Sequence, residues 1–293
     1  MHGTNGIKSQ LARKAVLVSL NVSMWGARKY DRKVTKEVNR SRHASDDAGR
    51  YNKLLIEKGR LAPVLAVVTE ARDLFYKYTR PWAKGVGILP NVSYAEFSNK
   101  MRVLKQRYGE VADVFAKEFP TYVAERKRKL SEIYDPKDYP SEREIRGKFS
   151  FDVNFDVVPD VGDFRSDGID EDTLNDIRAE IAESEKRIER DAIAHTYGEI
   201  ADVVRKMAEK LGEYKVEKGK HFKDTLVDNI RELAVLLPTF NLTDDPKLEE
   251  ITKRLQKELC IEDAKTLRDS DDVRASVKKS AEEILAEVEK HMA

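Results

Sequence analysis

Two segments of this chain alternate between apolar and polar positions with a period of two. They cover residues 16–25 and residues 149–158. Strict alternation over this length predicts strands that are buried on one face. Because an isolated strand is not stable in water, we expect the two to pair in a small sheet, with a third short piece near Asp163–Arg165.

Most of the remaining chain has helical spacing, and the longest predicted helix covers residues 171–214. Its later part carries a heptad-like apolar seam: Ile193, Tyr197, Ile200, Val204, Met207, Leu211 and Tyr214. Other helices are predicted over 28–42, 51–58, 63–78, 93–119, 120–134, 142–148, 222–237, 245–259 and from 271 onward, with loops at 80–91 and 159–170 and a break at Lys218–Lys220. The pattern predicts a mainly α (α+β) fold, with long helices, a coiled-coil-like C-terminal hairpin and a small two- or three-stranded sheet.

Composition supports a helical protein of the reducing cytoplasm. Charged residues make up 37% of the 293 residues, and Gly (14) and Pro (9) are scarce. The single cysteine, Cys260, rules out an intrachain disulfide. No apolar run approaches the roughly 20 residues of a membrane span. We therefore expect a cytoplasmic protein without a membrane partner.

The overall charge of +1 conceals a division between the two halves of the chain. Residues 1–134 contain 27 Lys and Arg against 13 Asp and Glu, a net charge of +14, and the remainder carries −13. Such asymmetry indicates either a half that binds polyanions or halves that attract each other, within one molecule or between copies. We expect a basic α+β core at 1–165 and an acidic all-helical region at 166–293 packed on it, or one continuous domain.

The densest basic cluster follows the first predicted strand and is interleaved with aromatic residues. Lys and Arg neutralise phosphates, and aromatic faces stack on unpaired bases. The candidate nucleic-acid-binding residues are Trp25, Arg28, Lys29, Tyr30, Arg32, Lys33, Lys36, Arg40, Arg42, Arg50, Lys53, Arg126, Lys127, Arg128 and Lys129. A solvated helix face, with its aromatic residues turned into the core, explains the same pattern about equally well.

Catalytic and cofactor motifs are weak throughout. His195 and Glu199 lie four residues apart on the longest helix, a spacing that is usually structural. Asp152, Asn154 and Asp156 share one strand face, where they are more simply explained by exposure to solvent. We therefore expect no cofactor, no metal site and no enzymatic activity.

Four segments resemble a known family: VLVSLNVSMWGARKYDRKVTKEVN (16–39), SDDAGRYNKLLI (45–56), YDPKDYPSEREIRGKFSF (134–151) and VVPDVGDFR (157–165). The family is a group of uncharacterised phage and bacterial proteins, the domain of unknown function numbered 3150. This resemblance implies a phage origin, hence the host bacterial cytoplasm, and no assigned catalytic residues. Some members are encoded near MoxR-type AAA+ ATPases and proteins with von Willebrand A-like domains.

Charge and resemblance together predict a phage-type nucleic-acid-binding protein. The most specific form is an oligomer that binds or anneals single-stranded DNA in phage DNA metabolism, held together through its basic and acidic halves; duplex nucleic acid is a second possible ligand. The alternative is a protein-interaction module without catalytic activity, as an adaptor or assembly component of an AAA+ ATPase system or an inhibitor of a host system. A metal-dependent enzyme using Asp152 and Asp156 or His195 ranks last.

Overall fold

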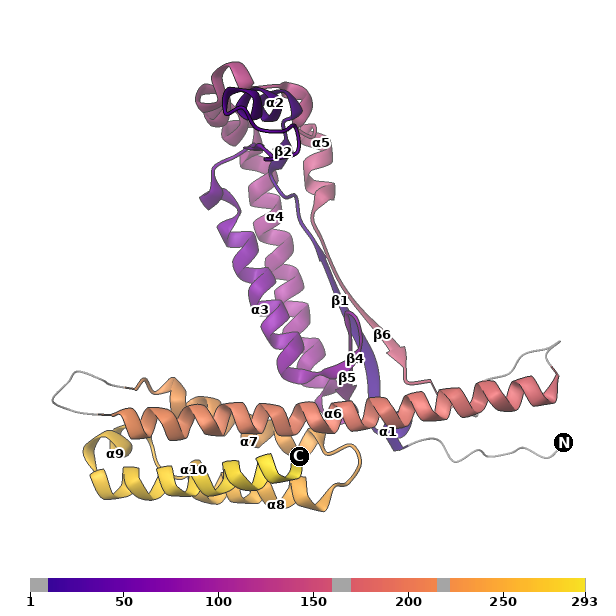
Figure 1. Cartoon of the computed structure of the whole chain (residues 1–293), viewed down its shortest axis with the longest axis vertical. Helices are drawn as coiled ribbons and strands as arrows, with labels where there is room; N and C mark the ends of the chain where they lie inside the picture. Colours follow the sequence, from indigo (N-terminus) through magenta and orange to yellow (C-terminus); the bar gives the residue numbers. More distant parts are fainter. Residues whose placement is uncertain (1–9, 160–169, 215–221, 293) are drawn as a thin grey trace. The chain divides into compact units, whose positions relative to one another are not determined.

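The computed structural model describes residues 10–159, 170–214 and 222–292. Helices dominate this part of the chain and two small sheets accompany them, so the predicted mainly α (α+β) class is confirmed (Figure 1). The predicted strand near Asp163–Arg165 and the predicted break at Lys218–Lys220 lie outside the described residues. None of the described helices has the length and apolar character needed to span a membrane.

The chain divides into two compact units that are each discontinuous in sequence. Unit 1 comprises residues 1–18, 78–95 and 155–293, and unit 2 comprises residues 19–77 and 96–154. Unit 2 contains 26 Lys and Arg against 18 Asp and Glu, a net charge of +8, which leaves −7 for unit 1. The positive charge of the first half of the sequence is therefore concentrated mainly in unit 2.

Four strands form the larger sheet in the order β4-β5-β1-β6. β1 (Ala15–Ser23) and β6 (Ser150–Val157) correspond to the two segments of alternating sequence. Their predicted strand conformation and their pairing are both confirmed, since they are neighbours in the sheet. The chain passes from one unit to the other within each of these two strands.

The prediction of a loop at 80–91 was wrong, because this segment forms the hairpin of β4 (Arg80–Ala83) and β5 (Val86–Pro90). Two glycines make the hairpin possible. Gly85 has a φ of +78° in the turn, and a Cβ on Gly87 would lie 2.6 Å from the Thr79 Cβ. The glycines that suggested a loop are thus the residues that permit tight pairing of the two strands.

Unit 1 is built around a bundle of helices. Its helices are α1 (Gln10–Lys14), α6 (Glu171–Glu213), α7 (Thr225–Phe240), α8 (Pro246–Arg254), α9 (Ala264–Asp269) and α10 (Asp271–Met292). A π-helical turn, Leu255–Leu259, continues α8. The predicted seam of α6 is confirmed over its second half, where Ile200, Val204 and Met207 are fully buried in the main core cluster. α6 packs there against α7 and α10 (Figure 1).

Pro238 lies inside α7, although the sequence predicted that the helix would end before it. Proline has no N–H to donate to the carbonyl four residues earlier, that of Ala234. The Gln256 side chain supplies the missing donor, because its Nε2 lies 3.1 Å from the Ala234 oxygen. A partner from the turn after α8 therefore lets the helix continue.

Unit 2 contains the helices α2 (Arg32–Ser41), α3 (Ala62–Tyr78), α4 (Tyr94–Leu130) and α5 (Glu142–Ile145). Short 3₁₀ turns connect them at Lys58–Leu61, Ser131–Ile133, Pro136–Asp138 and Arg146–Lys148, and another, Asn91–Ser93, precedes α4. The predicted helix break at Pro120 was wrong, since α4 continues through it to Leu130. Figure 1 shows α3 beside α4, with α2 at one end of the pair.

Candidate nucleic-acid interface

The candidate cations gather on a small substructure, residues 28–54, which we call the basic lobe. β2 (Arg28–Tyr30) pairs antiparallel with β3 (Asn52–Leu54), and α2 lies between them in sequence. The sequence predicted helix at both 28–30 and 52–54, which was wrong. Asp31 accounts for the first error, because its side chain accepts from the Val34 N–H and so begins α2 only after the strand.

The inward face of α2 is polar rather than apolar. Thr35 donates to the Asp31 carbonyl at 2.7 Å and accepts from the Tyr51 N–H at 3.0 Å. Asn39 donates its side-chain amide to the carbonyl of Asp46 at 3.1 Å. Both side chains are buried, so these bonds fix the loop 42–51 against the helix. Sequence periodicity missed them because it registers apolar contacts alone.

Lys53 lies at the centre of a buried ion cluster in unit 2. Its Nζ is 2.9 Å from Asp31 Oδ2 and 2.6 Å from Asp138 Oδ2, and it donates to the Ile133 carbonyl at 2.8 Å. Burial alone would lower the pKa of Lys53, but the two carboxylates outweigh it and the pKa is raised. Burial likewise works to raise the pKa of Asp31, while hydrogen bonds from Val34 and Lys53 hold it below its ordinary value.

These two pKa shifts predict that the basic lobe loses stability at both extremes of pH. The lowered Asp31 pKa contributes stability above the ordinary value near 3.8, and this contribution is lost as the pH falls through the folded-state pKa. The raised Lys53 pKa contributes below about 10.5 and is lost at higher pH. Thermal unfolding of the wild type and of Asp31→Asn should therefore converge as the pH falls below 3.8. Curves that stay parallel as the pH falls below 3.8 would contradict this.

The outer surface of the basic lobe carries an excess of cations over its exposed acids, Glu37, Asp46 and Asp47. Within the part of the chain that the structure describes, none of its surface cations forms an ion pair with a carboxylate. These cations are Arg28, Lys29, Arg32, Lys33, Lys36, Arg40, Arg42 and Arg50. Lys36 is half-buried and the other seven are exposed. The lobe thus presents eight cations that form no ion pair with a carboxylate in the described part of the chain.

Two candidate residues are engaged within the unit instead: Lys53 is buried, and Trp25 is half-buried with its ring packed on other aromatic side chains. The Trp25 ring packs in an aromatic cluster, with centroid distances of 5.3 Å to Phe119 and 6.5 Å to Tyr139. Lys53 is 4% exposed and held by its two carboxylates. We remove both from the candidate surface. Tyr30 and Tyr51 remain on it, with 46% and 38% of their surface exposed.

The second basic run, 126–129, at the end of α4, contacts the segment that contains and follows β3. Arg126 Nε donates to the Leu54 carbonyl at 2.7 Å, and Lys129 pairs with Glu57. The Lys127 Nζ lies 5.4 Å from the Tyr134 ring centroid. Arg128 is exposed. The structure therefore brings together two clusters that are some 75 residues apart in sequence, although Arg126 and Lys129 are already engaged within the unit.

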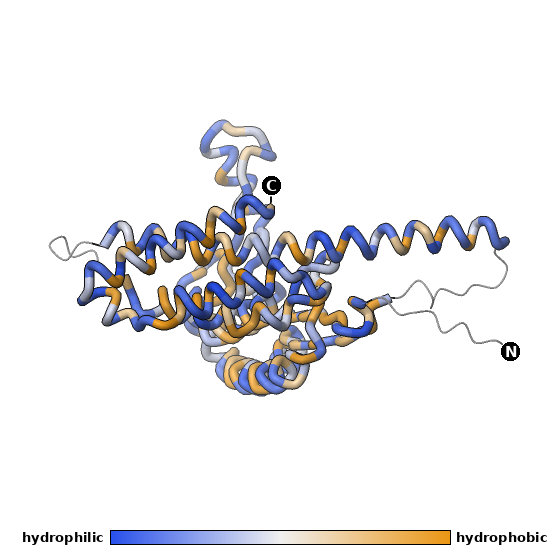
Figure 2. The backbone as a smooth tube through the Cα atoms, turned by 90° about the horizontal axis from the view of Figure 1, so that it is seen from below, coloured by the Kyte–Doolittle hydropathy of each residue, from blue (hydrophilic) through white to orange (hydrophobic). Residues whose placement is uncertain are grey.

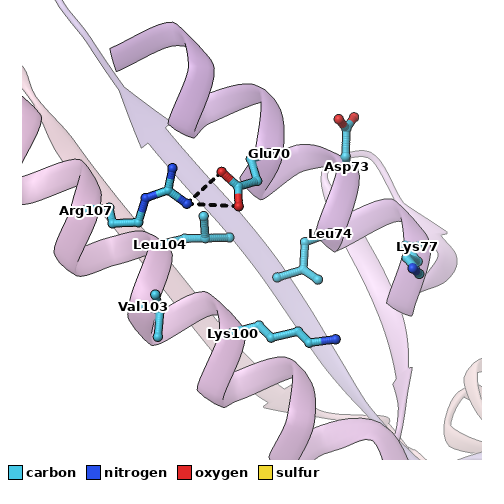
Figure 3. A pocket seen from close by; sticks show the side chains of 8 residues that line it. All are labelled: Glu70, Asp73, Leu74, Lys77, Lys100, Val103, Leu104 and Arg107. Atoms are coloured by element: carbon cyan, nitrogen blue, oxygen red, sulfur yellow. Dashed lines mark hydrogen bonds and ion pairs between the residues drawn. The ribbon is translucent and has the colours of Figure 1, made fainter. Parts of the chain in front are cut away.

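A groove between α3 and α4 has a different character (Figure 3). It encloses about 430 Å³, and Leu74, Val103 and Leu104 give it an apolar lining. Arg107 spans it to reach Glu70, with Nη1 at 2.8 and 3.0 Å from the two carboxylate oxygens. Charges of both signs surround the groove, so it does not extend the positive surface of the basic lobe.

Unit 1 contains a buried arginine that sequence reasoning missed. Arg80 on β4 is 1% exposed, donates to Thr196 at 2.8 Å, and pairs with Glu199 at 2.6 Å. Its guanidinium lies 3.4 Å from the centroid of the Phe240 ring. Burial lowers the pKa of Arg80 to about 10 despite the Glu199 charge. Glu199, considered above as a metal ligand with His195, is thus the partner of Arg80.

His195 lies on the same stretch of α6. Although His195 is exposed, partial desolvation of its ring and the positive charge of Arg80 lower the pKa of His195. Asp152, the other candidate for metal chemistry, has its Oδ1 3.3 Å from Lys105 Nζ. Among residues 10–159, 170–214 and 222–292, no three His, Cys, Asp or Glu side chains are grouped so as to hold a metal ion.

Known proteins give no further guidance on this surface. No family model, curated protein or solved structure matches the chain. Any function must therefore be argued from the surface itself.

Proposed function

We propose that this protein binds nucleic acid through the basic lobe, most specifically single-stranded DNA of phage DNA metabolism in the host cytoplasm. The carrying observation is the set of eight cations of the lobe that have no carboxylate partner within the described structure. Surface cations are commonly compensated by neighbouring acids, and the helices of unit 1 show this abundantly, as in Arg205 with Glu289 and Lys247 with Glu287. An uncompensated set favours a polyanionic ligand.

Single strands are favoured over duplex by the two exposed tyrosines. Tyr30 on β2 and Tyr51 just before β3 lie among the cations in sequence, and both residues are exposed. An aromatic face stacks on an unpaired base for about 1–3 kcal/mol, whereas a duplex keeps its bases stacked on each other. Because the Trp25 ring already packs on Phe119 and Tyr139, Tyr30 and Tyr51 are the stacking groups that we propose.

The test is a fluorescence-anisotropy titration of the full chain with a labelled single strand of ~60 nucleotides, repeated from ~50 to ~300 mM salt. Each phosphate neutralised on a single strand contributes about −0.7 to the slope of log K against log salt. Engagement of five or more lobe cations therefore predicts a slope steeper than about −3. Absence of binding at ~50 mM salt would sink the proposal. Equal affinity for duplex DNA would contradict the preference for single strands.

The alternative, a protein-interaction module such as an adaptor of an AAA+ ATPase, is favoured by a different observation. The first half of α6, residues 171–190, carries apolar residues that remain half-buried in unit 1. Co-purification of a defined partner, retained after the lobe cations are neutralised and lost after the α6 residues are changed, would support this alternative. Binding of the partner to the basic lobe would contradict it.

A further inference from the structure

The first half of α6 carries a second heptad seam. Leu174, Ile177, Ile181 and Ile188 follow one another at intervals of three, four and seven residues, with Ser184 between the last two. All of these side chains are half-buried. Apolar residues at the same spacing in the second half of the helix, such as Ile200 and Val204, are fully buried. The packing of unit 1 therefore buries the seam of the second half of the helix, which lies in a different heptad register, and leaves the seam of the first half partly in solvent.

The position of residues 171–190 within unit 1 explains why their side chains are only half-buried. Figure 1 shows that residues 171–190 extend beyond the part of α6 that lies beside α10. Figure 2 shows apolar positions recurring along an otherwise hydrophilic stretch of the same helix. Ile188 marks the transition, because it also packs on the small core cluster around Leu11 and Ile88. A solitary helix of about 20 residues with such a seam gains stability from a second helix laid along it.

The flanking charges identify the second helix. The heptad register follows from the apolar residues: the a positions are Leu174, Ile181 and Ile188, and the d positions are Ile177 and Ser184. In this register, Glu180 and Arg187 occupy successive g positions. In an antiparallel pair, with Ile177 of one copy against Ile188 of the other, Glu180 faces Arg187 of the second copy. Two-fold symmetry makes this ion pair twice. Arg178 and Glu185 at e positions face each other in the same way.

A parallel arrangement has the opposite outcome. In it a g residue faces the e residue five positions later on the partner helix, which brings Glu180 against Glu185 twice. Charge repulsion at both flanks opposes this pairing, and the attraction at both flanks favours the antiparallel one. We infer that residues 171–190 of α6 form an antiparallel two-helix coiled coil with the same segment of a second copy of this chain.

This pairing is independent of the proposed function, because it needs neither nucleic acid nor the basic lobe. Sedimentation equilibrium of the full chain should show a dimer at about 10–100 µM. Glu180→Arg and Arg187→Glu each turn both symmetry-related g–g contacts into like-charge contacts, so each alone should weaken the dimer at least ~10-fold. An equimolar mixture of the two variants restores both opposite-charge pairs, and a heterodimer of near wild-type affinity is expected.

Lys186→Glu is the matched control. It makes the same charge change one residue away, at an exposed f position that faces away from the partner, so the dimer should be unchanged. Circular dichroism checks that each variant keeps its helix content. A wild type that stays monomeric at ~100 µM would overturn the inference, as would a dimer strengthened by Glu180→Arg. Equal weakening by Lys186→Glu and Arg187→Glu would also overturn it.

Discussion

Lys53→Met should lower the free energy of unfolding by about 3–5 kcal/mol, the largest effect we expect from any single change in unit 2. Methionine fills a similar volume but leaves the carboxylates of Asp31 and Asp138, 14% and 12% exposed, without their shared cation. An uncompensated buried charge is more costly than the ion pair is stabilising. Asp31 also caps α2, so the damage reaches the start of the helix that carries four of the eight surface cations of the lobe.

Urea denaturation followed by the fluorescence of Trp25, in a Trp82→Phe background so that unit 2 alone is reported, measures this loss. Adding Asp31→Asn and Asp138→Asn to Lys53→Met removes the stranded charges and should recover at least half of the lost stability. The exposed neighbour Lys29, paired directly with Lys53 in the β2–β3 register, is the control, and Lys29→Met should change stability by less than about 0.5 kcal/mol. A loss below ~1 kcal/mol for Lys53→Met would contradict the ion-cluster account.

Arg80→Leu should destabilise unit 1 by about 3 kcal/mol or more. The substitution removes the bond to Thr196, the stacking on Phe240 and the partner of Glu199 together. Glu199 is 32% exposed, so water compensates part of its charge and the expected loss lies at the lower end for buried pairs. Arg80→Lys keeps the charge but not the planar guanidinium, and we expect an intermediate loss.

The double variant Arg80→Leu/Glu199→Leu separates charge from packing. If the cost of the single change is mainly a stranded carboxylate, the double variant should recover stability relative to Arg80→Leu. If the guanidinium chiefly fills space against Phe240, the double variant should be no more stable than the single one. Denaturant unfolding of the three proteins side by side gives the answer.

The elements that sequence predicted well are those whose packing is apolar and regular. The strands β1 and β6 were predicted from a sequence period of two, and the second half of α6 from apolar residues three to four positions apart. Prediction failed where a specific partner decides the structure. Gln256 lets α7 continue through Pro238, Asp31 delays the start of α2, and Thr79 requires a glycine at position 87 of a hairpin that looked like a loop.

The candidate surface shows the same limit. Charge counting located the basic lobe but treated all its cations alike, because sequence does not reveal which cation is buried. Lys53 is surrounded by carboxylates from residues 31 and 138, and the second of these is 85 positions away in the chain. Trp25 likewise packs on Phe119 and Tyr139, which are distant from it in sequence and close only in the folded chain. Once residues that are buried or already paired are removed, the predicted nucleic-acid-binding residues are reduced to the exposed cations, Tyr30 and Tyr51.

The measurement that tests the central claim most directly compares two triple variants in the single-strand titration. Arg32→Ala/Lys33→Ala/Arg40→Ala removes three exposed cations of the basic lobe, while Arg72→Ala/Lys117→Ala/Lys148→Ala removes three exposed cations of unit 2 outside it. Both lower the net charge of the unit equally. We predict that the first variant loses affinity at least ~10-fold and makes the salt slope shallower by about 2, while the second stays near wild type. Equal losses for the two variants, or no loss in the first, would contradict binding at the basic lobe.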